Sequence, residues 1–254
     1  MSKALVRRSF DRAAASYDQS AQLQRQVCAA LADLLTPPPP GTLLLDAGCG
    51  TGYGARLLAE RFPDHPLVLA DFAPAMLARA RAQTPERPAV CADVEALPFA
   101  NRRFGLYWSS LTLQWCDLHQ SLAEAARVLV PGGQLAFSTL GPGTFAEIDA
   151  AFAGIDRHRH VLPFAPPQSS AAAALAAGLK EVRIERRRLA LHYPDLRSLL
   201  RAIKDIGANQ VGAPRRPVLL GRSAWRAVEA RYEEFRTPAG LPATYDVILC
   251  TALK

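Results

Sequence analysis

The sequence predicts an α/β fold with a doubly wound, mostly parallel sheet. Short apolar runs typical of strands alternate with helical patterns between residues 42 and 140, a glycine-rich loop follows the first run, and an acidic residue lies at or beside the end of each of the first three runs. Apolar strands that alternate with helices are typical of parallel sheets covered on both faces. A chain of 254 residues is long enough for one such domain with additions.

The elements follow in a regular order along the first part of the chain. Residues 3–35 have the apolar spacing of one or two amphipathic helices, which the prolines at 37–40 end. The apolar runs predict strands over residues 42–47, 66–71, 87–93, 104–111 and 133–140. Helices are predicted between them over residues 53–62, 73–83 and 119–130, the last closed by the Pro-Gly-Gly at 131–133.

The pattern is less regular after residue 140. It indicates a helix over residues 171–180 and a long strand over 181–193. A clear amphipathic helix follows over residues 194–208, and a final strand covers residues 244–253.

Composition and charge narrow the class of protein. No apolar run approaches the roughly 20 residues of a membrane span, and the N-terminus lacks the apolar core of a secretory signal. The five scattered cysteines form no CxxC pair, so we expect no metal site, no disulfide framework and a cytoplasmic location. Eleven Arg or Lys residues but only three acidic residues lie between Arg183 and Arg226, so the net charge of +7 is regional and suits an acidic partner.

The glycine loop has the pattern Asp46-x-Gly48-x-Gly50-x-Gly52 between a strand and a helix, the context of a nucleotide-type site. Tyr53 breaks the GxGxxG fingerprint, and the lysine of a P-loop is absent. Asp71 ends the second strand, where a carboxylate can accept hydrogen bonds from both ribose hydroxyls. Asp93 follows the third strand, placed to meet the exocyclic amine of an adenine.

Taken together, "DAGCGTG", Asp71 and "ADVEALPF" resemble the class I S-adenosylmethionine-dependent methyltransferases over residues 41–140. The resemblance implies a Rossmann-like sheet of seven strands, the seventh antiparallel, and S-adenosyl-L-methionine as cofactor. It also implies which residues contact the cofactor: Gly48 and Gly50 would line it, and Asp71 would bind the ribose. Asp93 would bind the adenine amine with the Val94 backbone beside it, and Asp46 would brace the loop.

The flanking segments resemble one branch of these enzymes, the malonyl-acyl-carrier-protein O-methyltransferases of biotin synthesis. The resemblance rests on "SFDRAAASYDQSAQLQRQVCAALADLL", "SSLTLQWC", "FSTLGPGTFAEI", "LRAIKDIGAN" and "LPATYDVILCTALK". It implies an N-terminal helical lid over residues 1–36, a cofactor-binding core over 41–192, a helical insertion for the carrier protein over 193–240, and a last core strand over 241–254.

Three residues are candidates for contact with the methyl acceptor. In the resembled family the N-terminal helices cover the cofactor pocket, so we expect Tyr17 to act from this lid. Gln114 and Trp115 follow the carboxyl end of the fourth strand, where ligands bind in open α/β sheets. A malonyl carboxylate is already ionised at neutral pH, and the five histidines form no triad pattern, so we expect no catalytic general base.

Arg197, Arg201 and Lys204 are spaced i, i+4, i+7 on the helix over residues 194–208, so they share one cationic stripe beside its apolar face. Such a stripe suits an acidic carrier protein and the phosphate of its prosthetic arm. Three alternatives stay open: a methyltransferase of a small free acid, an RNA methyltransferase, and a cofactor-binding protein without turnover. The chain contains no recognisable RNA-binding module, so we expect no nucleic-acid partner, and we expect no membrane partner.

Overall fold

A seven-stranded sheet runs through the computed structural model, which describes residues 2–208 and 220–254. In spatial order its strands are β3-β2-β1-β4-β5-β7-β6; the first five pair in parallel, and β7 is antiparallel to both β5 and β6. This arrangement confirms the predicted fold class, including the antiparallel last strand. In chain order the strands are β1 (Leu43–Ala47), β2 (Leu67–Asp71), β3 (Ala89–Cys91), β4 (Phe104–Ser110), β5 (Leu129–Leu140), β6 (Lys180–Tyr193) and β7 (Leu241–Leu253).

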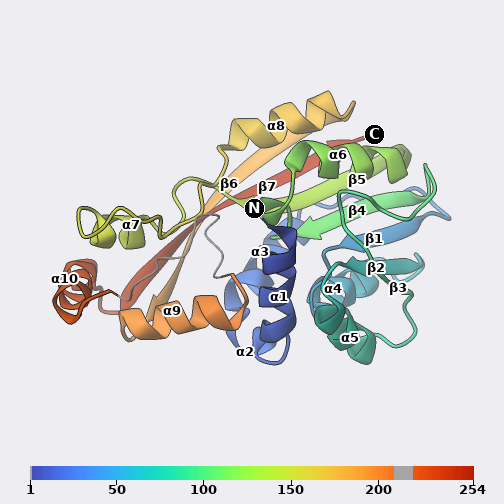
Figure 1. The fold of residues 1–254 in the computed structure, drawn as a ribbon. Coiled ribbons are helices and arrows are strands. Elements are labelled where there is room, and N and C mark those ends of the chain that lie inside the picture. Colours follow the sequence, from blue (N-terminus) through green and yellow to red (C-terminus); the bar gives the residue numbers. More distant parts are fainter. Residues whose placement is uncertain (1, 209–219) are drawn as a thin grey trace.

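Helices cover both faces of this sheet (Figure 1). One face carries α3 (Gln22–Ala32), α4 (Tyr53–Arg61) and α5 (Pro74–Gln83), and the other carries α6 (Leu118–Val128) and α8 (Pro167–Ala176). Successive side chains of a strand point to opposite faces, so Trp108 and Tyr107 of the central β4 enter different core clusters, and both are fully buried. Burial on both faces explains why the first five residues of β4, Phe104–Trp108, include no charged or strongly polar side chain.

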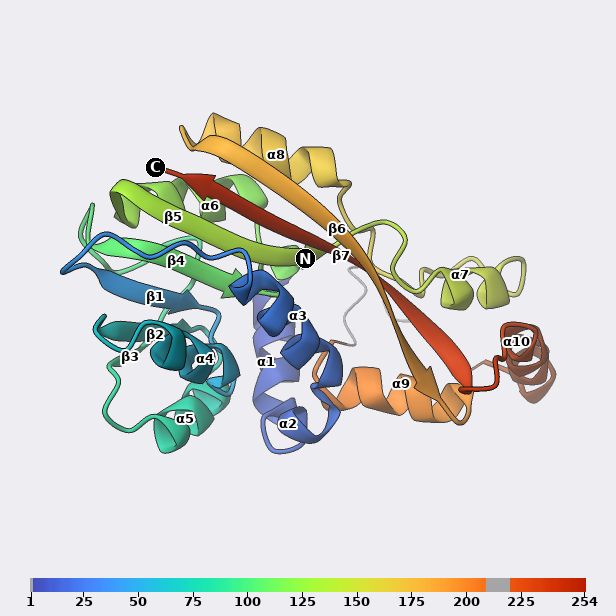
Figure 2. The same ribbon diagram turned by 180° about the vertical axis from the view of Figure 1, so that it is seen from behind.

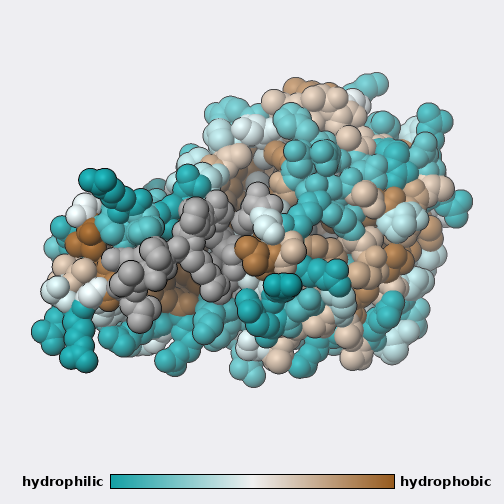
Figure 3. All heavy atoms as spheres, in the orientation of Figure 1, coloured by the Kyte–Doolittle hydropathy of each residue, from teal (hydrophilic) through white to brown (hydrophobic). Residues whose placement is uncertain are grey.

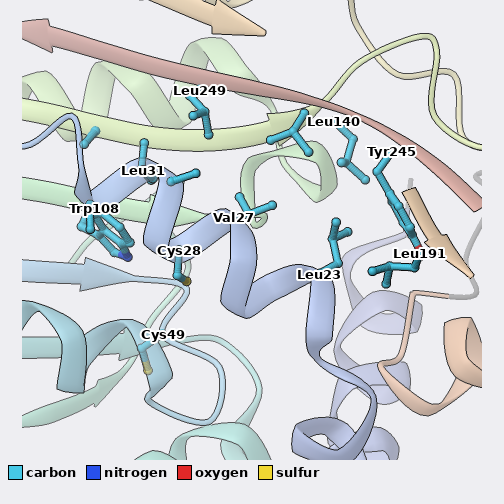
Figure 4. Packing of buried hydrophobic residues seen from close by; sticks show 14 of the residues in the cluster. Leu23, Val27, Cys28, Leu31, Cys49, Trp108, Leu140, Leu191, Tyr245 and Leu249 are labelled. Carbon is cyan, nitrogen blue, oxygen red and sulfur yellow. The ribbon is translucent and has the colours of Figure 1, made fainter. Parts of the chain in front are cut away.

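The N-terminal helices pack as one layer on the same side as α4 and α5. Leu23, Val27 and Leu31 lie along one face of α3 and meet Leu140 of β5 and Leu249 of β7 in the core (Figure 4). Two helices precede α3 in the chain. The first, α1 (Lys3–Ala13), packs on α5, and the second, the short α2 (Tyr17–Ser20), packs on α9 (Leu196–Asp205). The three helices therefore lie between the parallel core and α9 (Figure 2).

The paired β6 and β7 extend well beyond the other strands. Around their far end lie α9, the helix α7 (Ala146–Phe152), which was not predicted, and α10 (Arg222–Glu233), which lies in the region predicted as a helical insertion (Figure 1). Of the region predicted as a helical insertion, residues 209–219 lie outside the described residues, and the predicted domain limits stay a prediction.

The basic run Arg186–Arg188 lies on β6, the edge strand of the sheet. Arg186 Nη2 donates to Asp246 Oδ2 of β7 at 2.7 Å, and Arg187 pairs with Glu185. Part of the regional positive charge is therefore balanced within the protein. Charged side chains along an exposed edge also hinder pairing with another chain.

The predicted end of the helix over residues 119–130 is wrong. In the structure α6 ends at Val128, Leu129 is extended, and β5 begins there, so the Pro-Gly-Gly lies inside the strand. A proline restricts the residue before it to extended conformations, which favours a strand over a last helical turn at Val130. The ladder between β4 and β5 shifts register at this point. In the described part of the chain, no helix has the length and apolar character needed to cross a membrane.

Candidate functional site

The glycine loop connects β1 to α4 and adopts backbone conformations that favour glycine. Gly48 has φ +80°, and a Cβ there would lie 2.2 Å from Thr112 Oγ1, so a side chain would collide with the segment after β4. Gly50 has φ +54°, and no atom lies within 4 Å of its missing Cβ. The loop therefore lets the neighbouring segment approach at Gly48 and keeps open space at Gly50.

Two cavities border this loop, and a third meets them at Tyr17. Gly48, Gly50 and Tyr17 line both the first loop cavity, on the side of Asp71 and Asp93, and the second loop cavity. The second has a volume of about 270 Å³ and includes Asp46. The third, which we call the apolar cavity, has a volume of about 220 Å³ and is lined mainly by apolar side chains, among them Leu200, Ile203 and Ile206 of α9. Tyr17 lines all three, and Gln114 and Trp115 line the apolar cavity as well.

Asp71 joins the end of β2 to the glycine loop. Its carboxylate accepts hydrogen bonds from the backbone N–H of Gly50 at 2.9 Å and from that of Ala73 at 2.8 Å. Burial raises the pKa of Asp71 to about 6, although these two N–H groups favour the ionised form. The side chain is thus held rigidly at the wall of the first loop cavity.

Asp93 and Val94 line the same cavity beyond the end of β3. The Asp93 carboxylate forms an ion pair with Lys3 of α1 at 2.5 Å, and Lys3 also reaches Glu95 at 2.6 Å. The first turn of α1 is therefore tied across the mouth of the cavity. No local pattern singles out Lys3, because its partners lie about 90 residues away in the sequence.

Asp46 is buried, and its Oδ2 has no hydrogen-bond partner among the described residues. Burial raises its pKa to about 8, assisted by the charge of Asp71 and opposed by the Ala55 N–H. The Trp108 Nε1 also lacks a partner in the described part of the chain, and both atoms lie 3.0–3.1 Å from the position of a Cβ on Gly54. The structure thus places a carboxylate with one unsatisfied oxygen beside the glycine loop, and Asp46 and Arg25 line the same cavity.

Tyr17 and Trp115 are held by packing, and Gln114 by a hydrogen bond. The Trp115 ring meets Phe10 of α1 edge to face, with 5.7 Å between ring centroids. Gln114, in the short 3₁₀ helix η1 (Leu113–Trp115), donates from Nε2 to the Leu111 carbonyl at 2.7 Å. Burial raises the pKa of Tyr17 well above its usual value, so its hydroxyl stays protonated at neutral pH.

The cationic residues of α9 differ in their surroundings. Arg197 pairs with Glu229 of α10 at 3.2 Å and lies over the Trp225 ring, 5.5 Å from its centroid, so it joins two helices. Arg201 and Lys204 are exposed and have no ion-pair partner among the residues that the structure describes. The surface along α9 is mainly hydrophilic (Figure 3), whereas the opposite face of the helix lines the apolar cavity.

His160 is the histidine that reaches the apolar cavity. Its ring stacks on Phe152 at 3.6 Å between centroids, and its Nε2 lies 3.0 Å from Asp156 Oδ1. Within residues 2–208 and 220–254, no group of three or more His, Cys, Asp or Glu side chains could hold a metal ion.

Comparison with known proteins shows the family. Residues 45–137 match the family model described as a methyltransferase domain. The chain is 49% identical over 253 residues to the malonyl-[acyl-carrier protein] O-methyltransferase of Dechloromonas aromatica, covering 100% of this chain and 95% of that one. It is 40% identical to half of the biotin biosynthesis bifunctional protein BioHC of Cellvibrio japonicus, over 98% of this chain. Among solved structures, the same fold occurs in phosphoethanolamine N-methyltransferase 2 of Haemonchus contortus in complex with S-adenosyl-L-methionine, with a TM-score of 0.61. The two sequences are 17% identical, and the match covers 96% of this chain and 57% of that one.

The residues of the two loop cavities fit S-adenosyl-L-methionine. The buried Oδ2 of Asp46 lacks a partner among the described residues, and the cofactor carries an ammonium group and a sulfonium. Arg25 offers a cation in the same cavity for the cofactor's carboxylate, and the open space at Gly50 leaves room along the loop. From its near full-length similarity and its site, the chain belongs to the malonyl-[acyl-carrier protein] O-methyltransferase family of class I S-adenosylmethionine-dependent methyltransferases.

Proposed function

We propose that this protein methylates the free carboxylate of malonyl-acyl carrier protein, with S-adenosyl-L-methionine as methyl donor, to start pimeloyl synthesis for biotin. The observation that carries the proposal is an apolar cavity that meets the two loop cavities at Tyr17. Its volume of about 220 Å³ far exceeds the roughly 10–15 Å³ that one water needs, so it has room for a short acyl group. Such chemistry suits a cytoplasmic protein.

We assign the cofactor contacts from the cavity linings. Asp71 would accept from the ribose hydroxyls, Asp93 would accept from the adenine amine, and Val94 would lie beside the base. Asp46 and Arg25 would face the charged groups of the cofactor's amino-acid portion. Because Asp93 already pairs with Lys3, the N-terminal lid and the adenine contact share one carboxylate.

The reaction needs little chemistry from side chains. The cofactor supplies an electrophilic methyl group. The acceptor oxygen is already ionised, so it forms the new oxygen–carbon bond with its own lone pair while the carbon–sulfur bond breaks, and no proton is transferred. The apolar wall excludes water, and the packing of Trp115 on Phe10 holds the boundary of the cavity in place. His160, paired with Asp156, is not required as a base.

The exposed cations of α9 are placed to attract the carrier protein. Arg201 and Lys204 lie on the outer side of the helix whose inner face lines the apolar cavity. An acidic carrier protein docked there would bring its acyl arm to a helix that borders the acceptor site. Arg197, tied to Glu229, has mainly a structural role and contributes less to docking.

A methylation assay with labelled cofactor tests the function. Malonyl carrier protein should accept methyl in preference to free malonate, malonyl-coenzyme A and bulk tRNA, as an ester that mild base cleaves. Preferred labelling of free malonate or of tRNA, or a base-stable product, would contradict the proposal.

A charge-reversal experiment tests the docking surface. Arg201→Glu with Lys204→Glu should raise KM for malonyl carrier protein at least tenfold, because rim charges act mainly on association. The KM for a short malonyl thioester should change little. Salt should weaken the wild-type reaction with carrier protein, because the Debye length falls to about 3 Å at 1 M. The matched control is Arg222→Glu with Arg226→Glu, the same charge change on exposed residues of α10. Equal losses in both double variants would show that the effect of α9 is only one of net charge.

A further inference from the structure

The boundary between the apolar cavity and the loop cavities is formed by few side chains. Five described residues line the apolar cavity together with a loop cavity, and they are Phe10, Tyr17, Gln24, Leu111 and Trp115. Only Tyr17 and Gln24 carry a side-chain oxygen. Since the methyl acceptor and the methyl donor must meet at this boundary, these two side chains and the indole N–H of Trp115 are the polar groups that border the reaction.

Gln24 lies in the first turn of α3 with an unsatisfied amide. Its Oε1 is buried and has no hydrogen-bond partner among the described residues. Buried side-chain amides in native proteins are nearly always hydrogen-bonded, so an unpaired one facing a cavity points to a ligand. Rotation of the amide by 180° exchanges its oxygen and nitrogen, so the same side chain can present N–H donors to that ligand.

The neighbouring polar groups are engaged or lie away from the boundary. Gln114 donates from Nε2 to the Leu111 carbonyl, and although its buried Oε1 also lacks a partner among the described residues, Gln114 lines the apolar cavity and neither loop cavity. Arg25, next to Gln24 in the sequence, donates to the Asp18 carbonyl at 2.8 Å and lines only the second loop cavity. The boundary side chains that can donate without breaking a described contact are therefore the Tyr17 hydroxyl, the Trp115 indole N–H and the Gln24 amide, and of these the Gln24 amide is the one with a buried atom that lacks a partner among the described residues.

We infer that the Gln24 side-chain amide holds the acceptor carboxylate by donating an N–H to the oxygen that does not react. This inference rests on the proposed function and assigns its binding residue for the malonyl carboxylate. A neutral donor suits the task, because it orients one oxygen and leaves the lone pairs of the other free. A cation at this position would bind the carboxylate more tightly but would draw electron density from the attacking oxygen.

The test compares two ligands that differ by the carboxylate alone. Binding of a short malonyl thioester and of the matching acetyl thioester is measured on the protein loaded with S-adenosylhomocysteine. In the wild type the malonyl ligand should bind more tightly. Gln24→Met keeps the length of the side chain but removes the donor, so it should reduce this preference about 10- to 100-fold and lower kcat/KM for methylation similarly. Binding of the acetyl thioester should change less than about twofold.

Gln24→Glu provides a second variant, because its carboxylate would repel that of the acceptor. It should lose more malonyl affinity than Gln24→Met, again with little effect on the acetyl ligand. Gln26→Met and Gln26→Glu are the matched controls on an exposed position of the same helix and should behave as wild type. Thermal unfolding and binding of S-adenosylhomocysteine confirm that each variant is folded.

Two outcomes would overturn the inference. An unchanged malonyl preference in a folded Gln24→Met protein would show that the amide does not contact the carboxylate. A tenfold loss of S-adenosylhomocysteine affinity with the malonyl preference intact would assign Gln24 to the cofactor instead. Both differ from failure of the proposed function, in which wild-type protein would not methylate malonyl carrier protein at all.

Discussion

Binding of the cofactor to this protein should release a proton from Asp46. The buried carboxyl has a pKa of about 8, so at pH 7 it is protonated in about nine molecules of ten when no ligand is bound. A cationic ligand group beside it favours the ionised form and lowers this pKa. If the carboxyl is fully ionised in the complex, about 0.9 proton per cofactor should be released at pH 7, and about 0.1 at pH 9.

Isothermal titration calorimetry measures this release. Binding enthalpies of S-adenosyl-L-methionine at pH 7, taken in two buffers with different ionisation enthalpies, give the number of protons from the slope. Asp46→Asn should lower the release at pH 7 by about 0.9 proton per cofactor and should weaken binding, because any protons exchanged by the cofactor's own amine are the same in both proteins. Equal proton release by wild type and a folded Asp46→Asn protein would refute the assignment of Asp46 to the cationic part of the cofactor.

Three further predictions concern stability and the loop. Gly50→Ala should fold but lose about 1–2 kcal/mol of unfolding free energy, because alanine is strained at this positive φ. It should also weaken cofactor binding about tenfold or more, measured by calorimetry, because its methyl group enters the loop cavities. Leu199→Ala, at a fully buried position of α9, should cost about 2–5 kcal/mol and lower Tm by about 5 °C or more, measured by circular dichroism. Hydrogen bonding from Arg186 is the main cause that lowers the pKa of Asp246 in the folded protein. The ionised carboxylate therefore stabilises the fold above the unfolded pKa of 3.8, and this stabilisation is lost as pH falls through the lower folded pKa. Asp246→Asn should remove this pH dependence of the free energy of unfolding, measured with denaturant at acidic pH. An unaltered cofactor affinity in Gly50→Ala would contradict the role of the loop in cofactor binding. An unchanged Tm in Leu199→Ala would contradict the burial of α9, and a wild-type pH dependence in Asp246→Asn would contradict the contribution of its ion pair with Arg186.

The parallel core could be predicted because its signals are local. Each strand is a short apolar run, each helix has its own periodicity, and the right-handed crossover rule arranges consecutive units in one sheet. The carboxyl ends of parallel strands lie along one edge, so Asp46, Asp71 and Asp93 had to come close together. The structure brings all three to the two loop cavities.

The region after residue 140 was predicted less well. The short α7 was missed, α10 lies in the predicted helical insertion but was not predicted as a separate helix, and the start of β5 was placed at Gly133 instead of Leu129. α7 is short, so its pattern carries little information on its own. The buried residues of α10 are only Val228 and Tyr232, so its apolar face is narrow. The stripe on α9 was predicted with three equivalent cations, but Arg197 is paired with a helix that the pattern did not show.

The sequence by itself determined the sheet, the glycine loop and the acidic residues beside it, since these depend on backbone propensity and on the short-range periodicity of apolar residues. Only the tertiary structure decided what closes the site. Lys3 meets Asp93, Tyr17 lines three cavities, and Gln24 comes to the boundary between donor and acceptor, because α1, α2 and α3 fold over an edge of the sheet made by residues far along the chain. Such contacts are set by packing between helices and the sheet across long sequence separations, and no local pattern in the N-terminal segment specifies which residue it will meet.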